Sequence, residues 1–259
     1  MHTREKLIVG NWKMNTVSLA EAETLARGVL HGVEHIERIT TVICPPTIWL
    51  VSLSHELPKL PHFKLGAQNV YSEESGAFTG EASPLMLKKL VDYVILGHSE
   101  RTHIFRETIS MVAEKVVSTL EHGFTPILCV GEDEPSDQPA AHVAQRLNHL
   151  VSELTEMELE QLVVAYEPVW AIGSGTPATP QYAETVLAAL RHVTTPKTRI
   201  LYGGSVNEQN APGFLSLPDC DGLLIGGTSL KLKPFLTICQ QADDVAQAAG
   251  HLSLHPHHS

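Results

Sequence analysis

The sequence lacks any apolar stretch long enough to cross a membrane. A transmembrane helix needs roughly 18 or more predominantly apolar residues in a row, and the apolar runs of this chain are far shorter. Residues 1–6 are charged and short, without the apolar core of a signal peptide. We therefore expect a cytoplasmic protein that is not inserted in a membrane.

Cysteine is scarce, and its spacing excludes the common metal and disulfide patterns. Cys44, Cys129, Cys220 and Cys239 lie far apart among 259 residues, with no C-x-x-C pair. In a chain of this size they are typical of reduced, buried thiols in a reducing compartment. Histidines are more frequent, but no set of ligands with metal-site spacing accompanies them. We predict neither a metal site nor a cofactor.

Positive charge is under-represented: 18 Lys and Arg face 29 Asp and Glu, a formal net charge of −11. This balance argues against nucleic acid or an anionic membrane surface as a partner. An anionic substrate would need a local positive field set against the global one. Hydrophobic residues at 43% and charged residues at 18% are typical of a folded globular protein.

The chain does contain a series of short apolar runs rich in Val, Ile and Leu. Most are continuous rather than alternating, which is typical of strands covered on both faces. The runs are Leu7–Gly10, Thr41–Cys44, Phe63–Ala67, Tyr93–Leu96, Pro126–Val130, Leu162–Tyr166, Arg199–Tyr202 and Leu223–Ile225.

Segments with helical periodicity separate these runs. Ser18 and Ser83 are plausible helix caps, the first with Glu21 three residues on and the second before Pro84. The expected helices are Ser18–His31, Leu85–Leu90, Ser110–Glu121, Ala141–Leu150, Glu156–Leu162, Thr179–His192 and Lys233–Ala249. Alternating strands and helices predict an α/β fold, a single-domain (β/α)₈ barrel over residues 1–250. The His-rich residues 251–259 are expected to form a disordered tail.

Polar and glycine residues follow the ends of these strands, and in a parallel barrel all such ends share one rim. Glu167 follows a strand directly and precedes Pro168, so it is a candidate general base. His98 ends another run. Taken singly, Glu167 is equally well explained as an exposed rim carboxylate in a surface ion pair, and His98 is better explained as a histidine that caps the next helix.

The last two strands are each followed by glycines, Gly203-Gly204 before Ser205 and Gly226-Gly227. Backbone N–H groups there could converge on an anion, which is the usual phosphate position in such barrels. Lys13, after the first strand, is either a local positive charge or an ordinary solvated lysine. The glycine-rich segment 171–176 beside Glu167 is either a mobile lid or a surface loop.

The motifs around these residues resemble those of the triosephosphate isomerases. They occur in order from the first strand to the last and leave only the tail uncovered. The similar segments are Gly10–Asn15, Ala67–Val70, Gly76–Glu81, Leu96–Arg101, Ala165–Gly173, Tyr202–Val206 and Asp221–Gly227. The resemblance implies interconversion of dihydroxyacetone phosphate and D-glyceraldehyde 3-phosphate, a step of glycolysis and gluconeogenesis, without a cofactor.

The resemblance also implies roles for individual residues. Glu167 would move a proton between two carbons, while an uncharged His98 polarises the substrate oxygens. Lys13 would supply positive charge beside Asn11, with Glu100 as a carboxylate near the site. Phosphate would be bound by backbone N–H groups of Gly173, Ser205, Gly226 and Gly227. Thr79 would reach the neighbouring subunit's site in a homodimer.

Two positions depart from the family pattern. Thr102 stands where the family usually has a second arginine, and Pro177 stands in a hinge that commonly reads Gly-Thr-Gly-Lys-Thr-Ala. The first change puts an ion pair in doubt, and the second could alter lid kinetics because proline restricts φ.

Three other functions remain as alternatives. The first is an isomerase of the same family that acts on a four-carbon ketose phosphate, such as an erythrulose phosphate. The second is a non-catalytic phosphate-binding barrel, against which the presence of Glu167, His98 and Lys13 argues. The third is a Schiff-base aldolase, which would need a lysine at the strand end where Glu167 stands.

Overall fold

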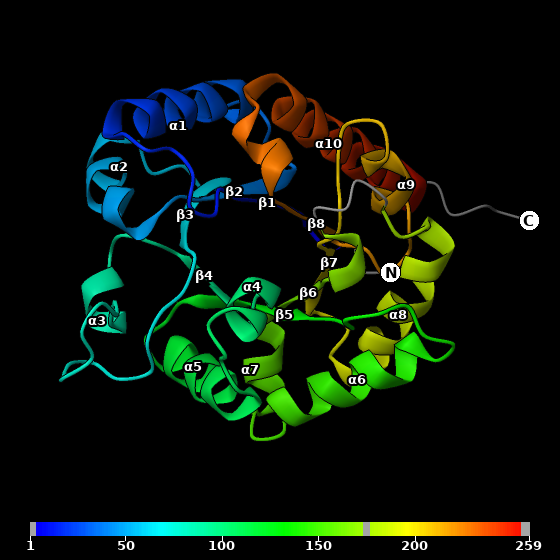
Figure 1. Cartoon of the computed structure of the whole chain (residues 1–259). Helices are drawn as coiled ribbons and strands as arrows, with labels where there is room; N and C mark the ends of the chain where they lie inside the picture. The colour runs from blue at the N-terminus through cyan, green and yellow to red at the C-terminus, as the bar shows by residue number, and fades with distance from the viewer. Residues whose placement is uncertain (1–3, 173–176, 255–259) are drawn as a thin grey trace, which may run out of the picture.

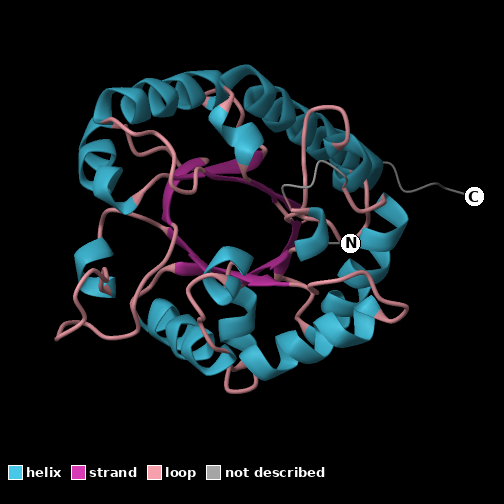
Figure 2. Ribbon diagram, in the orientation of Figure 1, coloured by secondary structure: helices cyan, strands magenta, loops and turns pink. Residues whose placement is uncertain are grey.

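The computed structural model describes residues 4–172 and 177–254, and its centre is a closed barrel of parallel strands (Figure 2). Each strand pairs with the next along the chain, and β8 pairs with β1 to close the sheet. The strands are β1 (Lys6–Asn11), β2 (Ile39–Cys44), β3 (Phe63–Ala67), β4 (Tyr93–Leu96), β5 (Thr125–Val130), β6 (Val163–Tyr166), β7 (Arg199–Tyr202) and β8 (Gly222–Ile225). The predicted (β/α)₈ barrel is confirmed.

Helices form a ring outside the barrel, as crossovers between parallel strands require (Figure 1). They are α1 (Leu19–Val33), α2 (Leu50–Glu56), α3 (Pro84–Leu87), α4 (Ser99–His103), α5 (Ile109–Glu121), α6 (Pro139–Leu150), α7 (Glu156–Gln161), α8 (Pro180–Val193), α9 (Ala211–Leu215) and α10 (Leu232–Leu254), with the 3₁₀ turns η1 (Thr47–Trp49), η2 (Val169–Ala171) and η3 (Gly227–Leu230). The first and last helices, α1 and α10, pack side by side and complete the ring.

The strands bury both faces, in two separate apolar clusters. Along β1, Leu7 and Val9 belong to the cluster inside the barrel, whereas Ile8 belongs to the larger cluster between barrel and helices. The same alternation holds along β6, where Val163 and Ala165 point inward and Val164 outward. Because side chains of a strand alternate between its faces, a strand buried on both faces needs an uninterrupted apolar run. This explains the runs in the sequence.

The expected strands agree with the observed ones to within two residues at each end; the largest difference is the start of β2 at Ile39 instead of Thr41. The predicted caps are also present. Ser18 accepts a hydrogen bond from the Glu21 amide at 3.3 Å, and Ser83 caps α3, which has Pro84 in its first turn. The Glu21 carboxylate accepts from the Val17 amide, one residue before the position of a standard capping box.

The helices differ from the expectation in several places. Helix α3 ends at Leu87 instead of Leu90. The short helices α2 and α9 were not predicted, because their few residues carry too little periodicity. Helix α10 continues to Leu254, past its expected end at Ala249. Of the expected tail, residues 255–259 lie outside the described part of the chain. In the described part, no helix is both long and apolar enough to cross a bilayer.

All the cysteines are free and buried, as predicted from their spacing. Burial raises the pKa of Cys220 to about 11 and that of Cys239 to about 12. Both thiols therefore stay protonated near neutral pH and behave as small apolar side chains.

A buried ion pair connects α5 to the segment that follows α4. The Nζ atom of Lys115, whose side chain is 2% exposed, lies 2.5 Å from Oε1 of Glu107 and 3.0 Å from Oδ1 of Asn69. Arg101 contacts the same Glu107 oxygen through Nε at 2.6 Å. Removing one partner of such a pair leaves an unpaired charge in the apolar interior. The loss in folding free energy is then larger than the stabilisation that the pair itself provides.

We expect Lys115→Met to lower the free energy of unfolding by about 3 kcal/mol, since it leaves the buried Glu107 with Arg101 alone. The control is Lys197→Met, whose side chain is 67% exposed and pairs with Glu160 at 3.0 Å. Its loss should stay below about 1 kcal/mol. Urea unfolding at one fixed protein concentration measures both, and equal losses would contradict the assigned role of Lys115.

Candidate active site

The predicted site residues meet at the carboxyl ends of the strands, around a cavity of about 540 Å³. Residues predicted from the sequence that line this cavity are Asn11, Lys13, His98, Glu167, Ser205, Gly226 and Gly227. They come from the ends of strands on different sides of the barrel, so the closure of the barrel brings them together. The structure thus places a carboxylate, an imidazole, an ammonium group and glycine backbone in one cavity.

Glu167 is buried, with 3% of its surface exposed, although it carries a carboxylate. Its backbone N–H donates to the carbonyl of Val130 at 2.8 Å, which fixes it at the end of β6 beside β5. Its Oε2 accepts from the Ser99 amide at 3.2 Å, and its Oε1 lies 3.2 Å from Nε2 of His98. A rim carboxylate in a surface ion pair, one of the two interpretations above, does not fit this burial.

His98 is the N-cap of the short helix α4, and the orientation of its ring follows from that role. Nδ1 accepts a hydrogen bond from the Glu100 amide at 3.2 Å, so Nδ1 carries no proton in this arrangement. The proton of the neutral ring then resides on Nε2, the atom that faces Glu167. The two interpretations of His98 are therefore compatible, because the capping bond presents an Nε2–H donor to the cavity.

Lys13 occupies a strained backbone position, with φ of 53°. The Asn11 side chain accepts from the Lys13 amide at 3.0 Å, and Nε2 of Gln68 donates to the Lys13 carbonyl at 2.8 Å. The ammonium group lies 2.6 Å from Oε1 of Glu100. Since a non-glycine residue with positive φ must be held by its surroundings, these bonds indicate that the position of Lys13 is imposed and is not that of a free surface lysine.

A further wall of the cavity, next to Lys13 and Glu167, is formed by the glycine-containing turns after β7 and β8. Gly227 is the first residue of η3, so its N–H has no partner within that turn. A Cβ atom on Gly226 would lie 3.3 Å from the Lys13 side chain, so glycine keeps this wall open. Ser205 donates through Oγ to the carbonyl of Ala171 at 2.5 Å. The predicted phosphate ligand Gly173 and the rest of the segment 173–176 lie outside the described residues.

Sequence reasoning missed two residues at this site. Lys231, directly after η3, lines the cavity beside the glycine turn, and a cation so soon after Gly226-Gly227 could have indicated it. Cys129, at the end of β5, adjoins Glu167; burial, and then the charge of Glu167, raises the pKa of its thiol. A single cysteine in an apolar strand gives no signal of this contact.

Thr102, which stands where the family usually has a second arginine, makes a hydrogen bond within its own helix. Thr102 donates through Oγ1 to the carbonyl of Ser99 at 3.1 Å, within α4. Arg101 keeps the ion pair with Glu107 described above. The substitution therefore leaves the helix that orients His98 with a hydrogen bond inside its own turn.

Thr79 lies apart from the cavity, on the segment between β3 and α3, which extends away from the barrel (Figure 1). The base of this segment is closed by a hydrogen bond from the Tyr71 amide to the Ala82 carbonyl at 2.9 Å. Thr79 itself is exposed. It contributes nothing to the cavity of its own chain.

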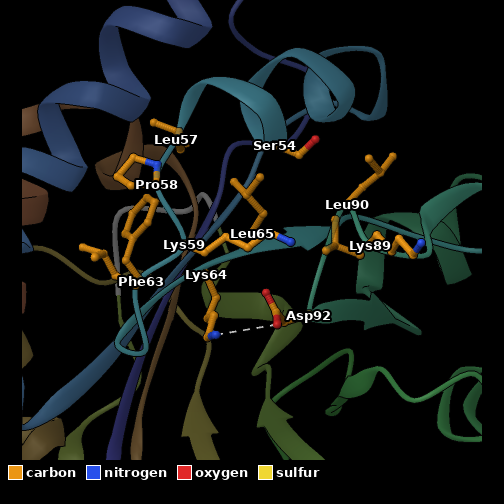
Figure 3. Close-up of a pocket in the computed structure, with 12 residues that line it drawn as sticks. Ser54, Leu57, Pro58, Lys59, Phe63, Lys64, Leu65, Lys89, Leu90 and Asp92 are labelled. Carbon is orange, nitrogen blue, oxygen red and sulfur yellow. Dashed lines mark ion pairs between the residues drawn. The ribbon is translucent and has the colours of Figure 1, made fainter.

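Another cavity, of about 130 Å³, lies at the amino ends of β3 and β4 (Figure 3). It is bordered by apolar side chains such as Leu57 and Phe63 and by lysines, of which Lys64 faces Asp92 at 3.7 Å. None of the predicted site residues lines it. Across the described residues, no cluster of three or more His, Cys, Asp or Glu side chains is arranged to hold a metal ion.

Comparison with known proteins agrees with the motifs. The family model described as triosephosphate isomerase matches residues 6–242. A triosephosphate isomerase of Dehalococcoides mccartyi strain BAV1 is 44% identical over 247 residues, which span 92% of this chain and 97% of the relative. Those of Clostridium tetani and Roseiflexus castenholzii are 43% and 42% identical, and in both cases the match spans 91% of this chain and 96% of the relative.

Gly131 is the position at which a small change should disturb this site most directly. A Cβ atom there would lie 1.7 Å from the backbone oxygen of Glu167, so Gly131→Ala must displace Glu167. Glu167 is the predicted base, and misplacement of a catalytic group by about 1 Å can cost 100-fold in rate, so we expect kcat to fall by about that factor. Steady-state kinetics with a triose phosphate measure it. Gly250→Ala, where an added Cβ meets nothing within 4 Å, is the matched control and should keep full activity.

Proposed function

The chain belongs to the triosephosphate isomerase family, and from this premise we infer that it interconverts dihydroxyacetone phosphate and D-glyceraldehyde 3-phosphate. The inference depends chiefly on one observation: a buried carboxylate and an imidazole Nε2 lie 3.2 Å apart at a cavity that is also lined by the glycine turns after β7 and β8. The reaction moves a proton between adjacent carbons and serves glycolysis and gluconeogenesis.

In this mechanism Glu167 removes the proton from C1 of dihydroxyacetone phosphate and returns it to C2. That proton lies next to a carbonyl and is weakly acidic, so the negative charge that develops on oxygen must be stabilised. His98 can donate Nε2–H to that oxygen while remaining uncharged, because its Nδ1 is occupied as an acceptor. In the established mechanism of the family, a carboxylate transfers the proton and a neutral imidazole donates a hydrogen bond to the substrate oxygen.

Lys13 supplies the positive charge that the enediolate oxygens need. Its ammonium group borders the cavity, and its backbone is held by Asn11. Glu100 pairs with Lys13 at 2.6 Å and is 43% exposed, so it holds the ammonium group at the rim without occupying the reaction site. A strongly acidic chain can thus present a local cation to an anionic substrate.

The phosphate group is bound at the turns after β7 and β8, by backbone N–H groups of Ser205, Gly226 and Gly227, with Gly173 as a fourth donor. Support comes from the glycine wall of the cavity and from the first N–H of η3. Lys231 adds a cation on the same side. Anchoring the phosphate there leaves the three carbons of the substrate to extend toward Glu167 and His98.

The three alternatives from the sequence receive little support. The named relatives are triosephosphate isomerases, and no observation favours a four-carbon ketose phosphate as substrate. A non-catalytic phosphate-binding barrel would not need Glu167 buried in contact with His98. A Schiff-base aldolase would need a lysine at the end of β6, where this chain has Glu167.

Glu167→Gln removes the base while keeping the size of the side chain. We expect kcat/KM for triose phosphates to fall roughly a thousandfold, with KM changed little because the phosphate site is untouched. Glu184→Gln, an exposed carboxylate on α8, is the control and should keep wild-type rates. Tetrulose phosphates are assayed in parallel. Faster turnover of the four-carbon substrate, or an unaffected Glu167→Gln variant, would contradict the proposal.

A homodimer in the cytoplasm is the second part of the proposal. The segment 71–82 extends from the barrel and carries the exposed Thr79 and Phe78. Near the active site Met14 and Val17 are 94% and 91% exposed, an arrangement that favours burial in an interface. A cavity of about 320 Å³ adjoins Lys13 there and is the place that Thr79 of a second copy would enter. Reduced, buried cysteines are consistent with the cytoplasm.

Sedimentation velocity tests the dimer directly. The wild-type chain should sediment as a particle of twice its 28.3 kDa mass. Thr79→Arg should shift the population toward monomer, because a long charged side chain would be buried at the interface. Thr24→Arg, on the exposed face of α1, should leave the dimer intact. A wild-type chain that is monomeric at micromolar concentration would overturn this part of the proposal.

A further inference from the structure

One buried carboxylate outside the reaction cavity collects an unusual number of donors. Glu132, after β5, is 8% exposed. Its Oε1 accepts hydrogen bonds from the hydroxyl of Tyr166 at 2.8 Å, from Nε1 of Trp170 at 3.0 Å and from the hydroxyl of Tyr182 at 3.0 Å. Three aromatic donors from three different elements therefore converge on a single oxygen.

These donors lie on both sides of Glu167 in the chain. Tyr166 precedes it directly, and Trp170 belongs to the turn η2 that follows Pro168. The backbone carbonyl of Glu132 also accepts from the Val169 amide at 3.0 Å. Through its side chain and its backbone carbonyl, Glu132 thus contacts residues on both sides of the proposed base in the chain.

Tyr182 differs from the other donors because it comes from the first turn of α8, outside the segment 166–170. Besides its bond to Glu132, its ring stands at 90° to that of Trp170, with centroids 5.5 Å apart, an edge-to-face contact. Its amide is bonded to the helix cap Thr179 at 3.2 Å. Tyr182 therefore links Trp170 and Glu132 to the start of a long helix.

The hydroxyl groups of Tyr166 and Tyr182 stay protonated and therefore act as hydrogen-bond donors. Burial, and then the charge of Glu132, raises the pKa of Tyr182 to about 12 and that of Tyr166 further. Neither hydroxyl ionises in the range where an enzyme of this kind works. The carboxylate consequently receives O–H donors at every relevant pH, and charge-assisted bonds of this kind are stronger than neutral ones.

We propose that Tyr182 is a positioning residue for the proton transfer: through Trp170 and Glu132 it holds the backbone that carries Glu167. It lines neither the cavity of the substrate nor the phosphate wall, so it acts without touching substrate. The inference rests on the proposed function. Its consequence is that the network should affect kcat and leave KM nearly unchanged, since substrate binding is mainly the work of the phosphate turns.

The test is Tyr182→Phe, which removes the hydroxyl and keeps the ring. We expect kcat to fall about tenfold, which corresponds to an increase of about 1.4 kcal/mol in the activation free energy of the reaction. KM should stay within about twofold of wild type. Proton abstraction should become more rate-limiting, so the primary isotope effect with C1-deuterated dihydroxyacetone phosphate should rise. A purely structural role would not change the isotope effect.

Tyr93→Phe is the matched control. It also deletes a phenol hydroxyl, that of the buried Tyr93, which accepts from Arg199 at 3.2 Å at the amino end of β4, far from the rim. It should leave kcat and the isotope effect unchanged. An equal fall of kcat in both variants would overturn the assignment, as would an effect of Tyr182→Phe confined to KM.

A second variant tests the route of the effect. Trp170→Phe deletes the indole donor, and the double variant with Tyr182→Phe should be no slower than the slower single variant, because coupled residues are not additive. Fully additive losses would overturn action through Trp170. No turnover by the wild-type chain would overturn the proposed function and this inference together, whereas normal wild-type turnover with an unchanged Tyr182→Phe variant would overturn the inference alone.

Discussion

The contact between the Glu167 carboxylate and the His98 ring is the interaction around which the rest of the site is arranged. The two side chains come from the ends of β6 and β4, which are separated by β5, and 3.2 Å between Oε1 and Nε2 leaves little freedom for either strand. Gly131 lies against the Glu167 backbone and Gly203 lies against its side chain, where a Cβ would be 3.1 Å from Cγ. Small residues at these points let the Glu167 carboxylate approach closely, and dense packing keeps it there.

The protein is acidic overall, but positively charged groups are placed at the cavity where an anionic substrate would bind. The net charge is −11, yet Lys13 and Lys231 border the cavity on the side of the glycine turns. Glu100 compensates Lys13 at the more exposed part of the rim. Backbone N–H groups add partial positive charge without the desolvation cost of burying further lysines. The field at the cavity is therefore set by a few local groups and not by the overall balance.

Much of the fold could be predicted because each of its signals is local. Both-sided burial produces continuous apolar runs such as Leu7–Gly10, and Ser18 and Ser83 cap helices within three residues of themselves. Glu167 and His98 were predicted as site residues from their place after strands, and the structure brings their side chains together. The short helix α9 and the end of α10 were not predicted, because five residues leave no periodic signal and the ends of helices are poorly marked in a sequence.

By itself, the sequence determined the order of strands and helices and which polar residues follow strand ends. Burial of both faces gives strands continuous apolar runs, and burial of one face gives helices a period of 3.6 residues. Only the tertiary structure decided which of those residues touch. Lys13 and Glu100 are 87 positions apart, and Glu132 and Tyr182 are 50 apart. Such contacts depend on closure of the barrel and on individual side-chain rotamers, and the local pattern of a chain records neither.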